Sequence, residues 1–137
     1  MQDGSDLTII STGGVLGIAI EAASKLERAG HSTRLLSMPI LVPLDADAIS
    51  NAAHETKAIL TVEEHGIGGL GTMTAEVLTS TRTGIPFHAV RLGRDPIRVA
   101  GTQEELRSSQ GVSVEGIVAA AEKLLGSRPT SSPGRSA

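Results

Sequence analysis

At 137 residues, with a net charge of −3 at pH 7, the chain has the size and composition of one domain with an ordinary hydrophobic core. It contains no cysteine, which excludes disulfides, thiolate metal sites and a cysteine nucleophile. Its charges are interspersed, no apolar run reaches the ~20 residues that span a bilayer, and Phe87 is the only aromatic residue available for stacking on bases or sugars. These features predict a cytoplasmic protein that binds neither nucleic acid nor membranes.

Apolar runs alternate along the chain with stretches of helical periodicity. The run at residues 7–12 is typical of a strand, and from Val15 onward apolar residues recur about every 3.6 positions, as on one face of a helix. Asp45 and Ser113 each stand just before such a stretch and are predicted helix N-caps. The expected strands cover residues 7–12, 33–38, 58–62 and 87–92, and the expected helices begin near residues 15, 45, 72, 102 and 113.

This alternation predicts parallel strands joined by helical crossovers. The fold class is therefore α/β: a three-layer α/β/α domain with a mainly parallel sheet of four to five strands, spanning residues 1–126. Residues 127–137 contain no apolar side chain larger than alanine or proline, which predicts a disordered tail.

The stretch from residue 58 to residue 71 is the main candidate for a functional site. An apolar run, typical of a strand covered on both faces, is followed directly by Glu63, Glu64 and His65. Ligands and partners of open α/β sheets are usually met at the carboxyl ends of the strands. Because neighbouring residues of a strand point to opposite faces, Glu63 and His65 are expected on one side and Glu64 on the other.

These three side chains also suggest what chemistry the strand end could support. A glutamate beside a histidine can act as an acid/base pair, so His65 is the candidate catalytic residue. No second histidine lies nearby, so the metal-site signal is weak and no metal ligand is assigned.

A glycine cluster follows at Gly66, Gly68, Gly69 and Gly71. Glycine permits unusual φ angles and the close approach of another backbone, which suits a phosphate cradle or a packed subunit interface. No lysine lies within the loop to neutralise a phosphate, so an interface is favoured.

A second glycine turn, Gly13 and Gly14, ends the first predicted strand. A dinucleotide fingerprint would stand here, but Thr12 replaces its first glycine and no acidic residue ends the next strand. A tight turn with close strand–helix packing is therefore favoured, and the helix N-terminus beside Gly13 and Gly14 is a candidate anion site.

The order of elements resembles the C-terminal domain of the transketolase-like thiamine diphosphate-dependent enzymes. The most specific carriers are Val-Glu-Glu-His at 62–65 and Gly-Gly-Leu-Gly at 68–71. The segments at 6–13, 37–39, 43–45 and 92–95, and the pattern from 105 to 117, also fit. The resemblance runs from about residue 6 to residue 125.

The resemblance implies a division of labour between this chain and its partners. In the family, one other domain holds the cofactor diphosphate and Mg²⁺, a second holds the aminopyrimidine, and the C-terminal domain supports the dimer. No Gly-Asp-Gly…Asn metal–diphosphate motif occurs in this chain. The implied protein is a small subunit of a split transketolase, inactive alone, which self-associates around a dimer core and joins subunits that bind thiamine diphosphate and Mg²⁺.

The assembled enzyme would transfer a two-carbon ketol unit from a ketose, often phosphorylated, to an aldose. Under this resemblance, the strand end forms an interface or backs the active site through Glu63, Glu64, His65, Gly68, Gly69 and Gly71. The alternatives are an excised domain of a longer protein, the C-terminal part of a deoxyxylulose-phosphate synthase-like or 2-oxo acid dehydrogenase-like enzyme, and a stand-alone anion-binding regulatory α/β module.

Overall fold

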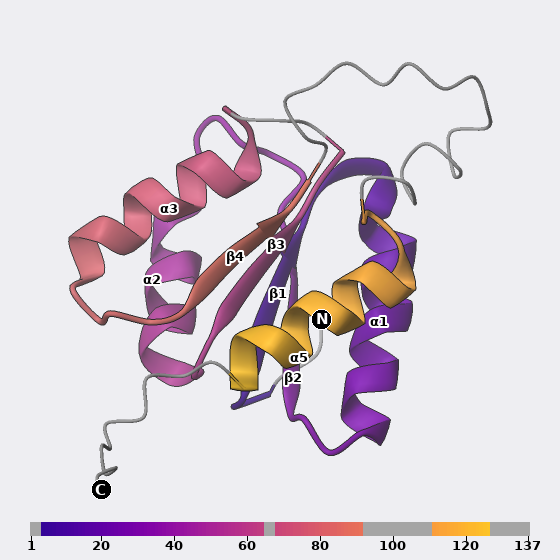
Figure 1. Ribbon diagram of the computed structural model, residues 1–137. Helices are drawn as coiled ribbons and strands as arrows, with labels where there is room; N and C mark the ends of the chain where they lie inside the picture. Colours follow the sequence, from indigo (N-terminus) through magenta and orange to yellow (C-terminus); the bar gives the residue numbers. More distant parts are fainter. Residues whose placement is uncertain (1–3, 65–67, 92–110, 127–137) are drawn as a thin grey trace, which may run out of the picture.

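A parallel sheet between two layers of helices forms the protein, shown as a computed structural model in Figure 1. The structure describes residues 4–64, 68–91 and 111–126. The sheet has four strands in the order β2-β1-β3-β4, all parallel. The strands are β1 (Leu7–Ser11), β2 (Thr33–Ser37), β3 (Ile59–Val62) and β4 (Phe87–Val90), and the helices are the 3₁₀ turn η1 (Gly13–Val15), α1 (Leu16–Arg28), α2 (Ala46–Glu55), α3 (Leu70–Thr81) and α5 (Val114–Gly126).

This architecture confirms the predicted α/β class and the parallel pairing. The short helix expected near residue 102 and the tail at 127–137 lie outside the described residues. No helix in the described ranges is long and apolar enough to cross a membrane.

The sheet has one hydrophobic cluster on each face. Helices α1 and α5 cover one face, and α2 and α3 cover the other (Figure 1). Strand β1 serves both, because neighbouring strand residues point to opposite sides: Ile9 packs with α1 and α5, whereas Ile10 packs with α2 and α3. The same central strands therefore support the hydrophobic clusters on both faces of the sheet.

Side chains fix where the helices begin. Asp45 caps α2 by accepting a hydrogen bond from the backbone N–H of Ala48 at 3.1 Å, and Ser113 caps α5 by accepting one from Gly116 at 3.0 Å. Both caps match the sequence prediction. Helix α3, by contrast, begins at Leu70, ahead of the predicted Thr72, for a reason that lies in the candidate site.

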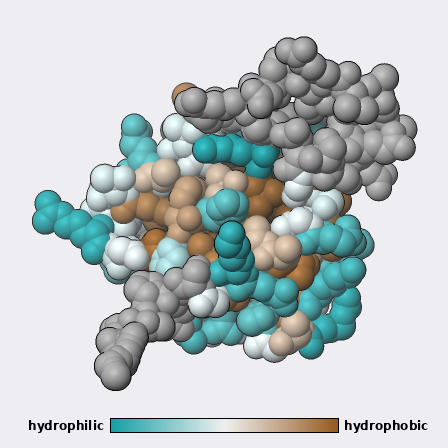
Figure 2. Space-filling view, in the orientation of Figure 1, coloured by the Kyte–Doolittle hydropathy of each residue, from teal (hydrophilic) through white to brown (hydrophobic). Residues whose placement is uncertain are grey.

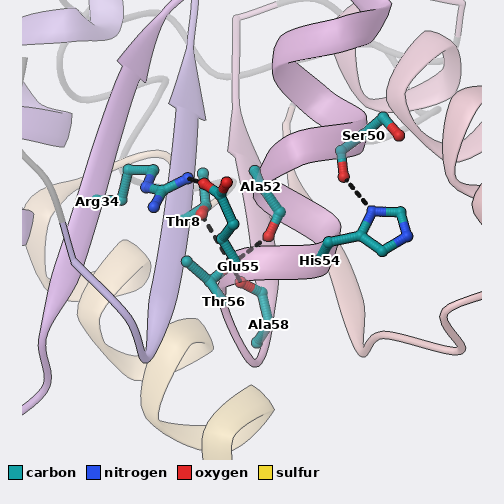
Figure 3. Close-up of polar contacts among 8 residues, drawn as sticks. All are labelled: Thr8, Arg34, Ser50, Ala52, His54, Glu55, Thr56 and Ala58. Atoms are coloured by element: carbon teal, nitrogen blue, oxygen red, sulfur yellow. Dashed lines mark hydrogen bonds and ion pairs between the residues drawn. The ribbon is translucent and has the colours of Figure 1, made fainter.

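A buried hydroxyl network joins α2 to the central strands at the amino edge of the sheet (Figure 3). The Thr56 hydroxyl donates to the Ala52 carbonyl at 2.8 Å, at the end of α2, and pairs with the Thr8 hydroxyl of β1 at 2.8 Å. Beside it, Arg34 of β2 forms an ion pair with Glu55 of α2 at 2.7 Å. These contacts hold α2 against the strands that lead to the site.

Candidate functional site

The strand order places a topological switch point between β1 and β3. These neighbours are followed by α1 and α3, which pack on opposite faces of the sheet, so the chain segments that follow the two strands diverge. The two strand ends stay joined, because Thr12 N–H donates to the Val62 carbonyl at 3.4 Å. Ligands of open α/β sheets bind at such a switch point. Two of the sequence-predicted sites, Gly13–Gly14 and Glu63–Glu64, meet here.

Glu63 is held entirely inside the protein. Its side chain is fully buried, and its carboxylate accepts hydrogen bonds from the backbone N–H groups of Leu70 at 2.7 Å and Gly71 at 2.5 Å. These are the first two residues of α3, where unpaired N–H groups and the helix dipole both favour a negative charge. Glu63 therefore starts α3 at Leu70 and ties it to the end of β3.

Gly71 lets this corner close tightly. A Cβ atom at Gly71 would lie 2.8 Å from the Ala89 Cβ, 2.8 Å from the Arg91 Nη1 and 3.1 Å from the Glu63 Oε2. Real Cβ atoms essentially never approach other heavy atoms to less than 3.0 Å. The absence of a side chain at Gly71 is thus what allows β4 and the Glu63 carboxylate to approach the first turn of α3.

The Glu64 side chain lies on the β1 side of the switch point, near Gly14. Its Oε1 atom lies 3.2 Å from where a Cβ on Gly14 would stand, beside η1 and the start of α1. The side chains of Glu63 and Glu64 therefore point to opposite faces of the sheet, as strand alternation predicts. The candidate anion site at Gly13 and Gly14 therefore has the Glu64 side chain as a neighbour.

Gly68, two residues before α3, is hydrogen-bonded to a threonine of that helix. The Thr72 hydroxyl accepts a hydrogen bond from Gly68 N–H at 2.8 Å and another from the Arg91 Nη1 at 3.2 Å. Gly68 has a φ of +104°, a conformation that suits glycine, and Gly69 is the residue just before α3. His65, the candidate catalytic residue, and Gly66 lie outside the described residues.

In the described part of the switch point, the side chains position the neighbouring strands and helices. Both Glu63 oxygens are committed to the backbone of α3. Within the described ranges, no three His, Asp or Glu side chains are grouped so that they could hold a metal ion. The corner therefore fixes where β3 ends and where α3 begins, and it shapes the surface between these two points.

The fold and this corner define a parallel α/β domain with a switch point at which, in the described residues, two glutamates lie at the end of β3. The family model for the transketolase C-terminal domain matches residues 1–117. The chain therefore belongs to the transketolase C-terminal domain family, as the sequence resemblance predicts.

Two curated relatives extend this likeness. The chain is 37% identical over 118 residues to one subunit of the apulose-4-phosphate transketolase of Phocaeicola vulgatus, covering 85% of this chain and 37% of that one. It is 36% identical over 126 residues to the 1-deoxy-D-xylulose-5-phosphate synthase of Desulfitobacterium hafniense (strain DCB-2), covering 90% of this chain and 20% of that one.

A solved structure described as a split gene transketolase, inactive beta4 tetramer, is similar with a TM-score of 0.79 and 35% identity. The match covers 91% of this chain and 40% of that chain. The chain thus spans about two fifths of the length of the transketolase subunits it matches, and about one fifth of the synthase.

Sequence reasoning located the strand end but missed two of its contacts. It treated Gly14 and Glu64 as separate features, although the pairing of β1 with β3 brings them together. It also treated Thr72 only as the start of a predicted helix and missed its contacts with Gly68 and Arg91. A threonine in the first turn of a helix that follows a glycine loop is a signal that could have indicated this contact.

Proposed function

We propose that this chain is the C-terminal-domain component of a split, thiamine diphosphate-dependent transketolase, in which it supports assembly and is inactive alone. The assembled enzyme transfers a two-carbon ketol unit from a ketose, often phosphorylated, to an aldose. The observation that carries the proposal is the match to an apulose-4-phosphate transketolase subunit and to a split gene transketolase chain over only 37% and 40% of their lengths. The rest of the catalytic machinery is then expected from partner domains.

The cofactor is assigned to those partners. Thiamine diphosphate needs a diphosphate site with Mg²⁺ and a pocket for its aminopyrimidine. Glu63 uses both carboxylate oxygens on α3, and no group of three His, Asp or Glu side chains is present in the described ranges to hold the metal. We therefore expect the partner domains to hold the cofactor.

The chain's own contribution is the shape of the switch point. Glu63 fixes the first turn of α3, Gly71 lets β4 close on it, and Thr72 holds the segment at Gly68. This corner is proposed to face the partner subunits and to place His65 beside their active site. Glu64, Gly68 and Gly69 are proposed as interface residues of the same corner.

Apolar surface elsewhere on the molecule supports a role in an assembly. Figure 2 shows hydrophobic surface in the middle of the view, where β4 and α5 lie in Figure 1. A cavity of about 330 Å³ there is lined by His88 of β4 and by Ala119, Ala120, Lys123 and Leu124 of α5. Exposed apolar surface beside a cavity is available for contact with another protein.

The test is reconstitution. The purified chain is mixed with the proteins encoded by neighbouring genes, and ketol transfer is measured with thiamine diphosphate and Mg²⁺, using each component alone as a control. Activity is expected only in the mixture. Full activity of the larger proteins alone, with no binding of this chain, would contradict the proposal.

Substitutions at the corner separate assembly from chemistry. For His65→Ala and Glu64→Gln, we expect a higher concentration of the chain for half-maximal activity, with little change in the rate at saturation. A rate that stays low at saturation for His65→Ala alone would instead make His65 a catalytic residue.

The likeness to the synthase favours one second candidate. At 36% identity over 126 residues, the chain could equally complete an enzyme that forms 1-deoxy-D-xylulose 5-phosphate. The same reconstituted mixture distinguishes the two, because this product and a ketol-transfer product are separated by mass spectrometry.

A further inference from the structure

Exposed aliphatic side chains gather in one loop of the protein. Among the described residues, three large hydrophobic side chains are strongly exposed: Ile20 at 48%, Ile40 at 62% and Val42 at 83%. Ile20 stands on α1, whereas Ile40 and Val42 both lie in the loop between β2 and α2. Single exposed aliphatic residues are ordinary, but two in one short loop indicate a surface that another chain covers.

A cavity of about 330 Å³ is lined by Ile40 and by Pro43, the residue that follows Val42 in the chain. Most of its wall is aliphatic or proline, and it joins the end of β2 to the first turns of α2. We call this cavity the β2–α2 pocket. Its wall consists of Leu36, Ser37, Met38, Pro39, Ile40, Pro43, Asp45 and Ala48.

Six of the eight described wall residues are aliphatic or proline. Asp45 is the one ionisable residue among them, and its exposed carboxylate caps α2 by accepting the backbone N–H of Ala48. The described wall contains no lysine or arginine to meet an anion. Burying an unpaired charge or polar group against such a wall is costly. The mainly apolar wall therefore favours an uncharged, aliphatic occupant.

The pocket and the switch point share one edge of the sheet. The pocket follows β2 and the Glu63 corner follows β3, with only β1 between them. Parallel strands lie about 4.8 Å apart, so the ends of β2 and β3 are separated by about 10 Å. One partner surface laid along the carboxyl edge would contact both features.

We propose that the β2–α2 pocket, together with the exposed side chains of Ile40 in its wall and Val42 in the same loop, docks uncharged aliphatic side chains of the partner domain that completes the transketolase. This inference rests on the proposed function. The relatives identify the occupant: only 37% of the apulose-4-phosphate transketolase subunit and 40% of the split gene transketolase chain match this domain. The larger share of each relative lies outside the matched domain and is the occupant that we assign to this pocket.

A second copy of this chain is the alternative occupant, and for either occupant the pocket would be only part of the interface. A stable protein–protein interface needs about 20–30 residues from each side, and the pocket and the exposed loop supply far fewer. As one part of a longer contact along the carboxyl edge, the same patch is large enough to serve as its apolar centre.

The test measures binding to the proteins that complete the enzyme in the reconstituted mixture. Val42→Asp places a charge in the exposed loop next to the wall residue Pro43, Val42→Ile keeps the aliphatic character, and Ile20→Asp adds the same charge to an exposed aliphatic position on α1. Because Val42 is 83% exposed, Val42→Asp should fold with an unchanged thermal midpoint. We expect Val42→Asp to weaken binding by about tenfold or more, with Val42→Ile and Ile20→Asp close to the parent chain.

Each result decides between the possibilities. If Val42→Asp binds as tightly as the parent chain, the docking surface is wrong while the proposed function stands. If the parent chain binds no partner at all, the proposed function fails, and this inference with it. If the chain is dimeric by light scattering and Val42→Asp makes it monomeric, the occupant is a second copy, which overturns the assignment to a partner domain.

Discussion

At the scale of single residues, two adjacent glutamates have separate tasks. Glu63 is buried and starts α3, whereas Glu64 points across the sheet to the turn at Gly14. A buried carboxylate is tolerated only where hydrogen bonds replace its hydration, and the first turn of a helix provides two N–H donors for Glu63. This explains how an acidic residue can end a strand that is otherwise apolar.

Glu63→Gln should weaken folding. Glutamine offers one acceptor oxygen to two N–H donors and turns its NH₂ group toward one of them, which leaves a buried donor unpaired at the start of α3. We expect a loss of about 1–3 kcal/mol in the free energy of unfolding, measured by urea denaturation. Glu76→Gln, the same change at an exposed position of α3, is the control. Equal losses in the two variants would argue against the cap.

Two glycines in helices should respond oppositely to the same substitution. Gly71→Ala places a Cβ atom 2.8 Å from Ala89 and should destabilise the fold by about 1–3 kcal/mol. Gly17→Ala in α1 meets nothing within 4 Å and should stabilise by about 0.5–1 kcal/mol, because alanine favours the helix. Thermal unfolding of both variants tests the pair, and a stable Gly71→Ala protein would show that β4 does not pack as described.

At the scale of elements, Asp6 joins the amino ends of three strands. Directly before β1, its carboxylate accepts the Ser32 N–H at 2.8 Å and an ion pair from Lys57 at 2.9 Å. Ser32 leads into β2 and Lys57 into β3. The hydrogen bond from Lys57, with that from Ser32, lowers the pKa of the Asp6 carboxyl from its usual value. The contribution is modest, because half of the Lys57 side chain is exposed.

This shift predicts how stability depends on pH. A carboxyl whose pKa is lower in the folded than in the unfolded state stabilises the fold above its unfolded pKa, about 3.9. That contribution is lost as the pH falls through the folded pKa. Asp6→Asn should therefore be less stable than the parent chain at pH 7, and the difference should shrink toward pH 2.

Urea denaturation across this pH range measures the difference directly. Lys57→Gln removes the larger cause and keeps the Ser32 bond, so its pH dependence should lie between those of the parent chain and Asp6→Asn. A difference between Asp6→Asn and the parent that stays constant with pH would assign the effect to something other than the Asp6 charge.

At the scale of the whole molecule, two hydrophobic clusters are supported by one sheet. Leu26 of α1 belongs to one cluster and Ile49 of α2 to the other, and both are fully buried. Because β1 contributes neighbouring residues to both clusters, neither layer can be lost without disturbing the strands that hold the other. The domain is therefore expected to unfold in one cooperative transition.

Ile49→Ala and Leu26→Ala should each lower the free energy of unfolding by about 2–5 kcal/mol. Each should also reduce hydrogen-exchange protection in the helices of both faces. Circular dichroism during urea unfolding gives the first quantity and amide exchange by NMR the second. Ile20→Ala, at an exposed position, is the control. Protection lost only on the mutated face would show that the layers unfold separately.

The sequence by itself determined the local features and the family. Apolar runs and helical periodicity identified the strands and helices, Asp45 and Ser113 identified two helix starts, and Val-Glu-Glu-His with Gly-Gly-Leu-Gly identified the relatives. These properties depend on residues close together in the chain, so spacing and residue type are enough to reveal them.

Only the tertiary structure decided which distant residues meet. The order β2-β1-β3-β4 makes β1 and β3 neighbours, and that pairing places Glu64 beside Gly14. Hydrogen bonds from the Leu70 and Gly71 N–H groups to Glu63 bring the first turn of α3 onto the end of β3. The β2–α2 pocket likewise exists only because α2 packs beside the end of β2. Strand order and the packing of layers are set by contacts between distant segments, which no local pattern records.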